Sequence, residues 1–211
     1  MNLKQISILV IVTVFSGAAH SDESWQLKPA EREQCLAVLR AGMHADEFWP
    51  GIHAAEALTL AGLGEEVRTF LEPKLKTETD DQKRCGLARE LVRAGNRDQS
   101  SVMLEILRKA DPHGHVHAAE SLYKVGWTGD SAPLEQAFAN TDDVRLRTMA
   151  AAALATHGDG SLQAQAFAFL RKSLRGENDP AVFRLSAWVL GRIGEVITHE
   201  KKQNARTHSQ R

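Results

Sequence analysis

A repeat with a period of about 32 residues runs through most of this 211-residue chain and restricts its fold more than any other feature. Five segments close on a glycine, each with a leucine four residues earlier and an alanine seven residues earlier. The glycines are Gly62, Gly95, Gly126, Gly158 and Gly194, the leucines Leu58, Leu91, Leu122, Leu154 and Leu190, and the alanines Ala55, Ala88, Ala119, Ala151 and Ala187. These offsets share one face of an α-helix, and glycine suits the left-handed conformation that ends a helix. The pattern therefore predicts five helices, each ended by its glycine.

A second amphipathic segment lies between successive glycine-ended helices. These segments cover residues 66–71, 102–107, 133–138 and 166–170. Each repeat is then a helical hairpin, and a hairpin of this size has to stack on its neighbours to bury its apolar face. We therefore expect an all-α fold, an α-solenoid of about five hairpins over residues 45–195. The apolar residues Cys35, Leu36, Val38 and Leu39 predict an N-terminal capping helix within 22–44.

The resemblance to a known repeat family is carried by residues 178–194. They contain an Asp179-Pro180 turn, the small pair Ser186-Ala187, and Leu-Gly and Ile-Gly at 190–191 and 193–194. This segment resembles the HEAT-like repeat named after phycobilisome lyases, and residues 142–154 resemble it again. The family's arginine, eleven residues before the glycine, is kept at Arg84 and Arg147, displaced by one at Arg184, and replaced by Gly51 and His115. The resemblance implies a right-handed solenoid whose concave face, lined by the second helix of each pair, binds other proteins.

The two ends of the chain differ from the repeats. Lys4, the apolar run 6–15 and the small residues after it predict a signal peptide at 1–21, cleaved near Ala19 or Ser21. The apolar run is shorter than the roughly 20 residues that span a bilayer, so we expect no stable membrane insertion after cleavage; an uncleaved anchor is the alternative. The chain is then secreted or periplasmic. Residues 196–211 are basic and nearly free of apolar side chains, which predicts a disordered tail.

Export would place Cys35 and Cys85 in an oxidising compartment, where they can form one disulfide. Both cysteines fall in helical patterns, and nothing in the sequence brings them together. Two separate buried thiols are the favoured interpretation, because free cysteine packs as a small hydrophobic residue. The pairing stays open at this stage.

Histidine is the one residue type that suggests chemistry. His53 and His117 begin the same His-Ala-Ala-Glu tetrapeptide at the same repeat position, and His113 and His115 come just before His117. Histidine and glutamate three residues apart can share a transition metal. Recurring packing explains a recurring tetrapeptide equally well, and about 20 Å would separate helices two repeats apart. We therefore predict no metal site and no cofactor, with His113, His115 and His117 as the weak metal candidates.

The remaining features favour binding over catalysis. The chain has no Gly-x-Ser-x-Gly elbow, catalytic cysteine signature or phosphate-binding glycine loop. Its net charge of −1 excludes the electrostatic footprint of a nucleic-acid binder. We predict a non-catalytic protein-interaction or scaffold module that binds a protein or peptide outside the cytoplasm. The alternative is a periplasmic protein that binds a metal or small ligand through His113, His115 and His117. Trp49, Trp127 and Trp188 are either staples between helices or interface anchors, and the oligomeric state is left open.

Overall fold

The computed structural model describes residues 27–175 and 179–208, with side chains as far as Gly194. These residues form ten α-helices and one short 3₁₀ helix and contain no β-strand, which confirms the predicted all-α fold for this part of the chain. The α-helices are α1 Pro29–Met43, α2 Phe48–Leu60, α3 Gly64–Thr77, α4 Asp81–Arg93, α5 Ser100–Leu107, α6 His115–Val125, α7 Ala132–Asn140, α8 Val144–His157, α9 Gly160–Ser173 and α10 Pro180–His208. The 3₁₀ helix η2, Arg97–Gln99, precedes α5.

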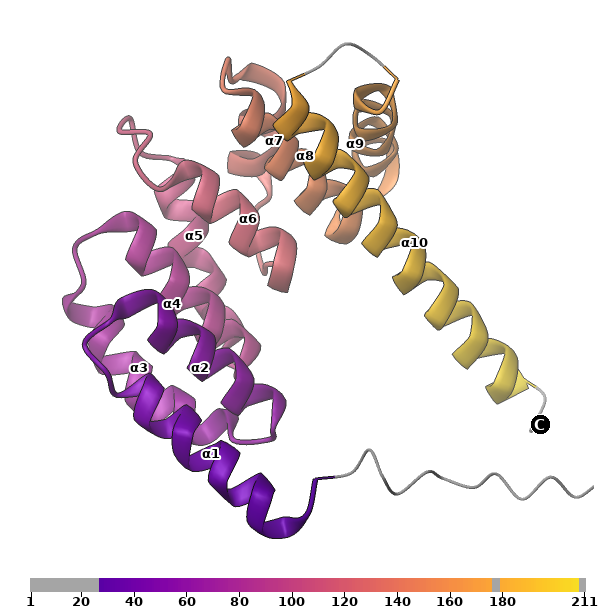
Figure 1. Cartoon of the computed structure of the whole chain (residues 1–211). Helices are drawn as coiled ribbons and strands as arrows, with labels where there is room; N and C mark the ends of the chain where they lie inside the picture. Colours follow the sequence, from indigo (N-terminus) through magenta and orange to yellow (C-terminus); the bar gives the residue numbers. More distant parts are fainter. Residues whose placement is uncertain (1–26, 176–178, 209–211) are drawn as a thin grey trace, which may run out of the picture.

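The helices pack in consecutive pairs. Each odd-numbered helix contacts the even-numbered helix that follows it, from α1 with α2 to α9 with α10. Each even-numbered helix also contacts the next one, so α2, α4, α6, α8 and α10 form a row. The row is visible in Figure 1 as the chain passes from α1 at the lower end of the molecule to α7, α8 and α9 at the upper end. Helix α1, within the predicted capping segment, is thus the first member of the first pair.

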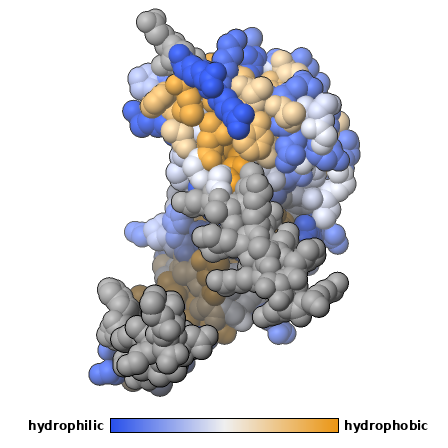
Figure 2. All heavy atoms as spheres, turned by 90° about the vertical axis from the view of Figure 1, so that its right-hand side faces the viewer, coloured by the Kyte–Doolittle hydropathy of each residue, from blue (hydrophilic) through white to orange (hydrophobic). Residues whose placement is uncertain are grey.

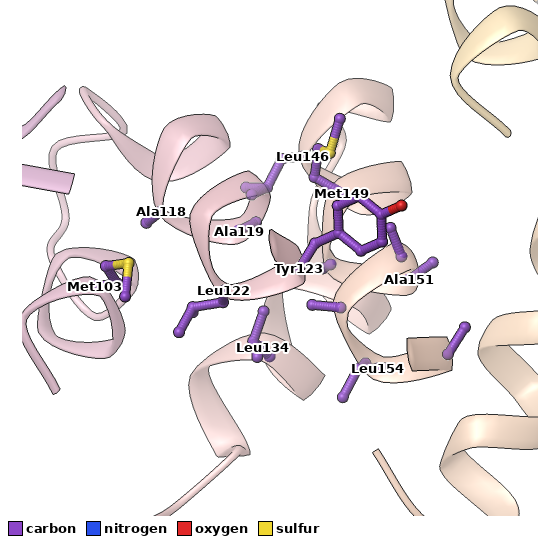
Figure 3. Packing of buried hydrophobic residues seen from close by; sticks show 14 of the residues in the cluster. Met103, Ala118, Ala119, Leu122, Tyr123, Leu134, Leu146, Met149, Ala151 and Leu154 are labelled. Carbon is purple, nitrogen blue, oxygen red and sulfur yellow. The ribbon is translucent and has the colours of Figure 1, made fainter. Parts of the chain in front are cut away.

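The predicted apolar stripe forms the core of the first four pairs. The repeat leucines Leu58, Leu91, Leu122 and Leu154 and the repeat alanines Ala55, Ala88, Ala119 and Ala151 are all completely buried. Helices α6 and α8 both contribute small buried side chains to one core cluster, Ala118 and Ala119 from α6 and the alanine run 150–153 from α8. Figure 3 shows Leu134 pointing from α7 toward the boundary between these two helices. Small side chains therefore bring the row together, and leucines from both layers fill the spaces beside it.

The fifth repeat departs from the expected burial. Ala187 is exposed and Leu190 only half-buried, while Ser186 and Val189, one position earlier in each case, are buried. No further helical pair follows α10 in the described part of the chain, so the side of α10 that faces away from α8 and α9 stays in solvent. Identical sequence positions thus have different environments at the end of the row.

The repeat glycines do not all end their helices in the predicted way. Gly62, Gly95 and Gly126 have positive φ, as expected, but Gly158 has a φ of −76°, and Gly194 lies inside α10. Helix α10 continues to His208, through most of the 196–211 segment for which the sequence predicted disorder. Residues 195–208 contain no glycine or proline, and half of them are glutamate, lysine, glutamine, alanine or arginine, which are compatible with a helix. The C-terminal part of α10, drawn in yellow, extends away from the other helices (Figure 1).

The predicted signal peptide, residues 1–21, lies outside the described residues. No helix in the part of the chain that the structure describes combines the length and the apolar character needed to cross a bilayer.

The difference between the fourth and fifth repeats can be tested with the matched substitutions Leu154→Ala and Leu190→Ala. Leu154 is fully buried, so its truncation should lower the free energy of unfolding by about 2–5 kcal/mol. Leu190 occupies the same repeat position but is half-buried, so its truncation should cost less than about 2 kcal/mol. Urea unfolding followed by circular dichroism measures both. Equal losses would mean that α10 is as deeply enclosed as α8.

Gly114 and Gly129 provide a second matched pair, because both have positive φ. A Cβ at Gly129 would meet nothing within 4 Å, whereas a Cβ at Gly114 would lie 2.9 Å from the Cβ of Asp81. Gly129→Ala should lower the free energy of unfolding by about 1–2 kcal/mol, because of backbone strain alone. Gly114→Ala should lower it by about 1–3 kcal/mol more, because the new Cβ also collides with Asp81. Thermal unfolding of the two variants is the measurement. A smaller loss for Gly114→Ala would contradict the close approach of this turn to α4.

Candidate interaction surface

Trp49 of α2 reaches across α4 to α6. Its side chain lies over Gly86 of α4, where a Cβ would come within 3.2 Å of the indole, and its ring stacks on the imidazole of His117. The ring centroids are 5.7 Å apart and the planes differ by 23°. Because Gly86 has no side chain, the indole can bridge helices two repeats apart. Trp49 therefore links α2, α4 and α6 at their exposed side. We call the exposed surface of the row of even-numbered helices, from α2 to α10, the row face.

The three candidate metal ligands point to different neighbours. His113 precedes α6, and its Nε2 lies 3.2 Å from Oδ2 of Asp80, the N-cap of α4. His115 borders a hollow between α5, α7 and α8, and its buried Nε2 has no hydrogen-bond partner. His117 stacks on Trp49. Residues two apart in a helix project in nearly opposite directions, so His115 and His117 cannot converge on one ion.

The first His-Ala-Ala-Glu tetrapeptide also lies apart from the other histidines. His53 of the first tetrapeptide is 70% exposed, and its Nδ1 lies 3.7 Å from Glu56 on the same helix. Among the described residues, no group of three or more histidine, cysteine, aspartate or glutamate side chains is arranged to hold a metal ion. The described residues therefore provide no group of ligands for the alternative function, a protein that binds a metal through its histidines.

The histidine run has a structural explanation in the junction where α4, α5 and α6 meet. Asp81 accepts hydrogen bonds from Lys109 Nζ at 2.6 Å and from Arg84 Nη1 at 2.9 Å. Burial raises the pKa of the Asp81 carboxyl, but these two cations outweigh the effect and hold the pKa below its usual value. A carboxylate in the first turn of α4 also suits the helix dipole. Asp81 thus anchors the turn that contains His113 and Gly114.

Where α2 meets α4, the charged side chains along the row face form ion pairs with one another. The completely buried Glu90 accepts a hydrogen bond from Arg89 Nε at 2.7 Å and another from Arg93. Arg93 also pairs with Glu56 of α2, 3.1 Å away. A buried charge is tolerated only when it is paired in this way. This part of the face therefore has little unsatisfied charge to offer a ligand.

The other end of the row face is hollowed into a groove between α6, α8 and α10. The groove has a volume of about 380 Å³ and is lined by Val116, Arg145, Met149, Ala181, Arg184, Leu185 and Trp188. Trp188 is 42% exposed, and its ring meets that of Tyr123 edge to face at 5.4 Å. Figure 2 shows apolar surface gathered over the upper part of the molecule, with hydrophilic atoms at its border. The floor of the groove is thus apolar and its one aromatic side chain is accessible.

Three arginines surround this groove. Arg145 and Arg184 are exposed and line it, and the guanidinium of Arg192 lies 5.5 Å from the centre of the Trp188 ring. None of the three forms an ion pair within residues 27–175 and 179–194. Arg40, Arg84, Arg89 and Arg93 elsewhere in the molecule are all paired with carboxylates. The groove therefore combines apolar contact area with three arginines that have no ion pair among the described residues.

Sequence reasoning identified this site only in part. The sequence leaves Trp188 as either a staple between helices or an interface anchor, and it identifies Arg184 only as a displaced repeat arginine. Met149 and Leu185 were not recognised, although each lies nine residues before its repeat glycine, at the position that His117 occupies in α6. That shared offset was the available signal. Which of these positions border a hollow depends on how α10 is placed, and the repeat pattern does not specify that.

The two cysteines are both free, and they differ in exposure. Cys85 is completely buried, with its Sγ 3.8 Å from the carbonyl oxygen of Gly114, and burial raises the pKa of this thiol to about 12. Cys35 is exposed on α1, so the expectation of two buried thiols is wrong for this residue. Its neighbour Leu36 takes the inward position instead.

Comparison of the chain with protein-family models, curated proteins and solved structures finds no match.

The difference between the thiols predicts selective labelling. At pH 8 an excess of Ellman's reagent should titrate one thiol in the folded protein and two in guanidinium chloride, because Cys85 is inaccessible and protonated in the fold. The variant Cys35→Ser should show no fast reaction when folded, and Cys85→Ser should react like the parent chain. Rapid reaction of both thiols in the folded parent would contradict the burial of Cys85.

Proposed function

We propose that the chain is a right-handed solenoid of the HEAT-like type that acts as a non-catalytic protein-interaction module outside the cytoplasm. The proposal places the partner, a protein or peptide, on the row face. The observation that carries it is the groove between α6, α8 and α10, where an accessible tryptophan, an apolar floor and arginines without an ion pair in the described part of the chain occur together. Tryptophan and arginine are the side chains most enriched among residues that dominate binding energy at protein interfaces.

The packing of the helices supports the solenoid part of the proposal. Five helical pairs follow one another in chain order, and each second helix lies on the next. Such an arrangement presents equivalent positions of successive repeats on one long surface. In the HEAT-like resemblance, this surface of second helices is the concave one. A partner that lies along it can contact several repeats at once.

The chemistry of the groove favours binding over catalysis. Among the described residues that line it there is no carboxylate, imidazole, thiol or hydroxyl group, so these residues offer no nucleophile and no general acid or base of ordinary pKa. Its arginines suit the recognition of carboxylates, because the planar guanidinium group matches the geometry of a carboxylate. An apolar floor with cations at its border is the arrangement expected of a docking site.

Photo-crosslinking in the cells that produce the protein tests this proposal. Trp188 is replaced by the photo-reactive residue benzoylphenylalanine, which keeps an aromatic ring in the groove. Val38, 66% exposed on α1 and off the row face, is replaced in the same way as the matched control. We expect one discrete crosslinked protein from position 188 and none from position 38. No adduct from position 188, or the same adducts from both, would contradict a docking role for the row face.

A further inference from the structure

A second hollow continues the groove along α10. It has a volume of about 180 Å³ and is lined by Tyr123, Lys124, Thr156, His157, Arg192 and Ile193. The contact between Tyr123 and Trp188 lies where the two hollows meet, and Arg192 borders the second hollow while resting on Trp188. From Ala181 to Ile193 the track follows about 18 Å of helix. An extended peptide of about five or six residues has that length.

We infer that this track binds an extended peptide segment of a partner protein in which acidic residues flank a large apolar side chain. The inference rests on the proposed interaction module and names the chemistry of its ligand. The apolar side chain would lie against Met149, Leu185 and Trp188, and the carboxylates would pair with Arg145, Arg184 and Arg192.

The apolar part of the inference follows from the floor of the first hollow. Val116 of α6, Met149 of α8 and Leu185 of α10 meet there, and the accessible ring of Trp188 forms one wall. Methionine adapts its shape to different apolar partners, and tryptophan offers a large rigid surface at low entropic cost. Covering these side chains with a leucine-sized or phenylalanine-sized group removes apolar surface from water on both molecules, which is favourable.

The acidic part follows from the charges that remain unmatched. Arg145 and Arg184 lie at the first hollow and Arg192 at the junction, without an ion pair among the described residues. Lys124, the other basic side chain of the second hollow, is already paired with Glu120 at 2.7 Å. Burial lowers the pKa of His157, whose Nε2 lies 2.8 Å from the carbonyl oxygen of Tyr123, and this favours the neutral imidazole. The three arginines are thus the cations available to a ligand, and a guanidinium binds a carboxylate through two parallel hydrogen bonds.

The same features disfavour other occupants. The basic residues Lys201, Lys202 and Arg206 of this chain carry the same sign of charge as the track. Nucleic acid would supply anions, but aliphatic side chains form most of the floor, and single-stranded binders use successive aromatic platforms in a basic groove. Compared with these two occupants, an acidic peptide offers both carboxylates for the arginines and aliphatic side chains for the floor.

Selection from a random heptapeptide library displayed on phage tests the inference, with the chain from residue 22 to 211 as bait and its Arg184→Glu variant for counter-selection. The enriched peptides are synthesised with a fluorescent label, and their Kd is measured by fluorescence anisotropy. We expect aspartate or glutamate within two positions of leucine, phenylalanine or tryptophan. Arg145→Glu, Arg184→Glu and Trp188→Ala should each weaken binding by about tenfold or more. Affinity should also fall as sodium chloride is raised.

Arg171→Glu is the matched control. Arg171 is an exposed arginine of α9 that lies over Phe167 rather than in the track, so its reversal changes net charge equally and should leave the peptide Kd unchanged. Circular dichroism melting of every variant separates lost binding from lost folding. The exposure of Arg145 and Arg184 predicts melting temperatures close to that of the parent chain.

Three results would overturn the inference: no enriched peptide, enriched peptides without acidic residues, or binding that survives reversal of Arg145 and Arg184. A labelled oligothymidylate that binds the parent chain and is lost in Arg184→Glu would assign the track to nucleic acid instead.

The crosslink from position 188 distinguishes the two proposals. If that crosslink forms but no acidic peptide binds, the interaction module stands and the ligand chemistry is wrong. If neither is found, both proposals fail.

Discussion

The close approach of successive second helices is the interaction on which the rest of this structure depends. Helices α6 and α8 both contribute small side chains to one core cluster, Ala118 and Ala119 from α6 and the alanine run 150–153 from α8, all of them buried. Dispersion and the removal of apolar surface from water both increase as helices come closer, so small residues at a contact make it tight. Larger side chains from the first helices, such as Leu134 of α7 and Leu170 of α9, then fill the spaces beside the row. The order of the five pairs follows from this repeated contact.

That contact also determines which side chains can carry function. In a row held together by one stripe of each helix, the opposite stripe becomes a continuous exposed face. Around α2 and α4 the protein's own side chains cover the row face and pair its charges. Trp49 lies over Gly86, and Glu90 accepts hydrogen bonds from two arginines. Around α10 the face remains open, with an accessible tryptophan and arginines that have no carboxylate of their own among the described residues. The candidate site is the place where an apolar hollow, an accessible tryptophan and such arginines occur together.

The histidines show how an equal sequence pattern can have unequal surroundings. The tetrapeptides that begin at His53 and His117 match residue for residue, yet the first imidazole is exposed and the second is stacked on an indole from another pair. His113 is held at the N-cap of α4, and its separation from His117 follows from the turn anchored by Asp81. These partners come from helices distant in the sequence. No local pattern around a histidine contains that information.

The sequence alone determined the helical class, the pairing of helices and the buried register of four repeats, because these depend on periodic burial, which is local and repeats with the chain. It did not determine the environment of the fifth repeat, where Ala187 and Leu190 keep the pattern but no further pair covers them. Only the tertiary structure decided that Cys35 is exposed and Cys85 buried, that the three candidate histidines diverge, and that α6, α8 and α10 enclose a groove. Each of these outcomes depends on the distance between side chains of different pairs, and that distance is fixed only when the helices pack.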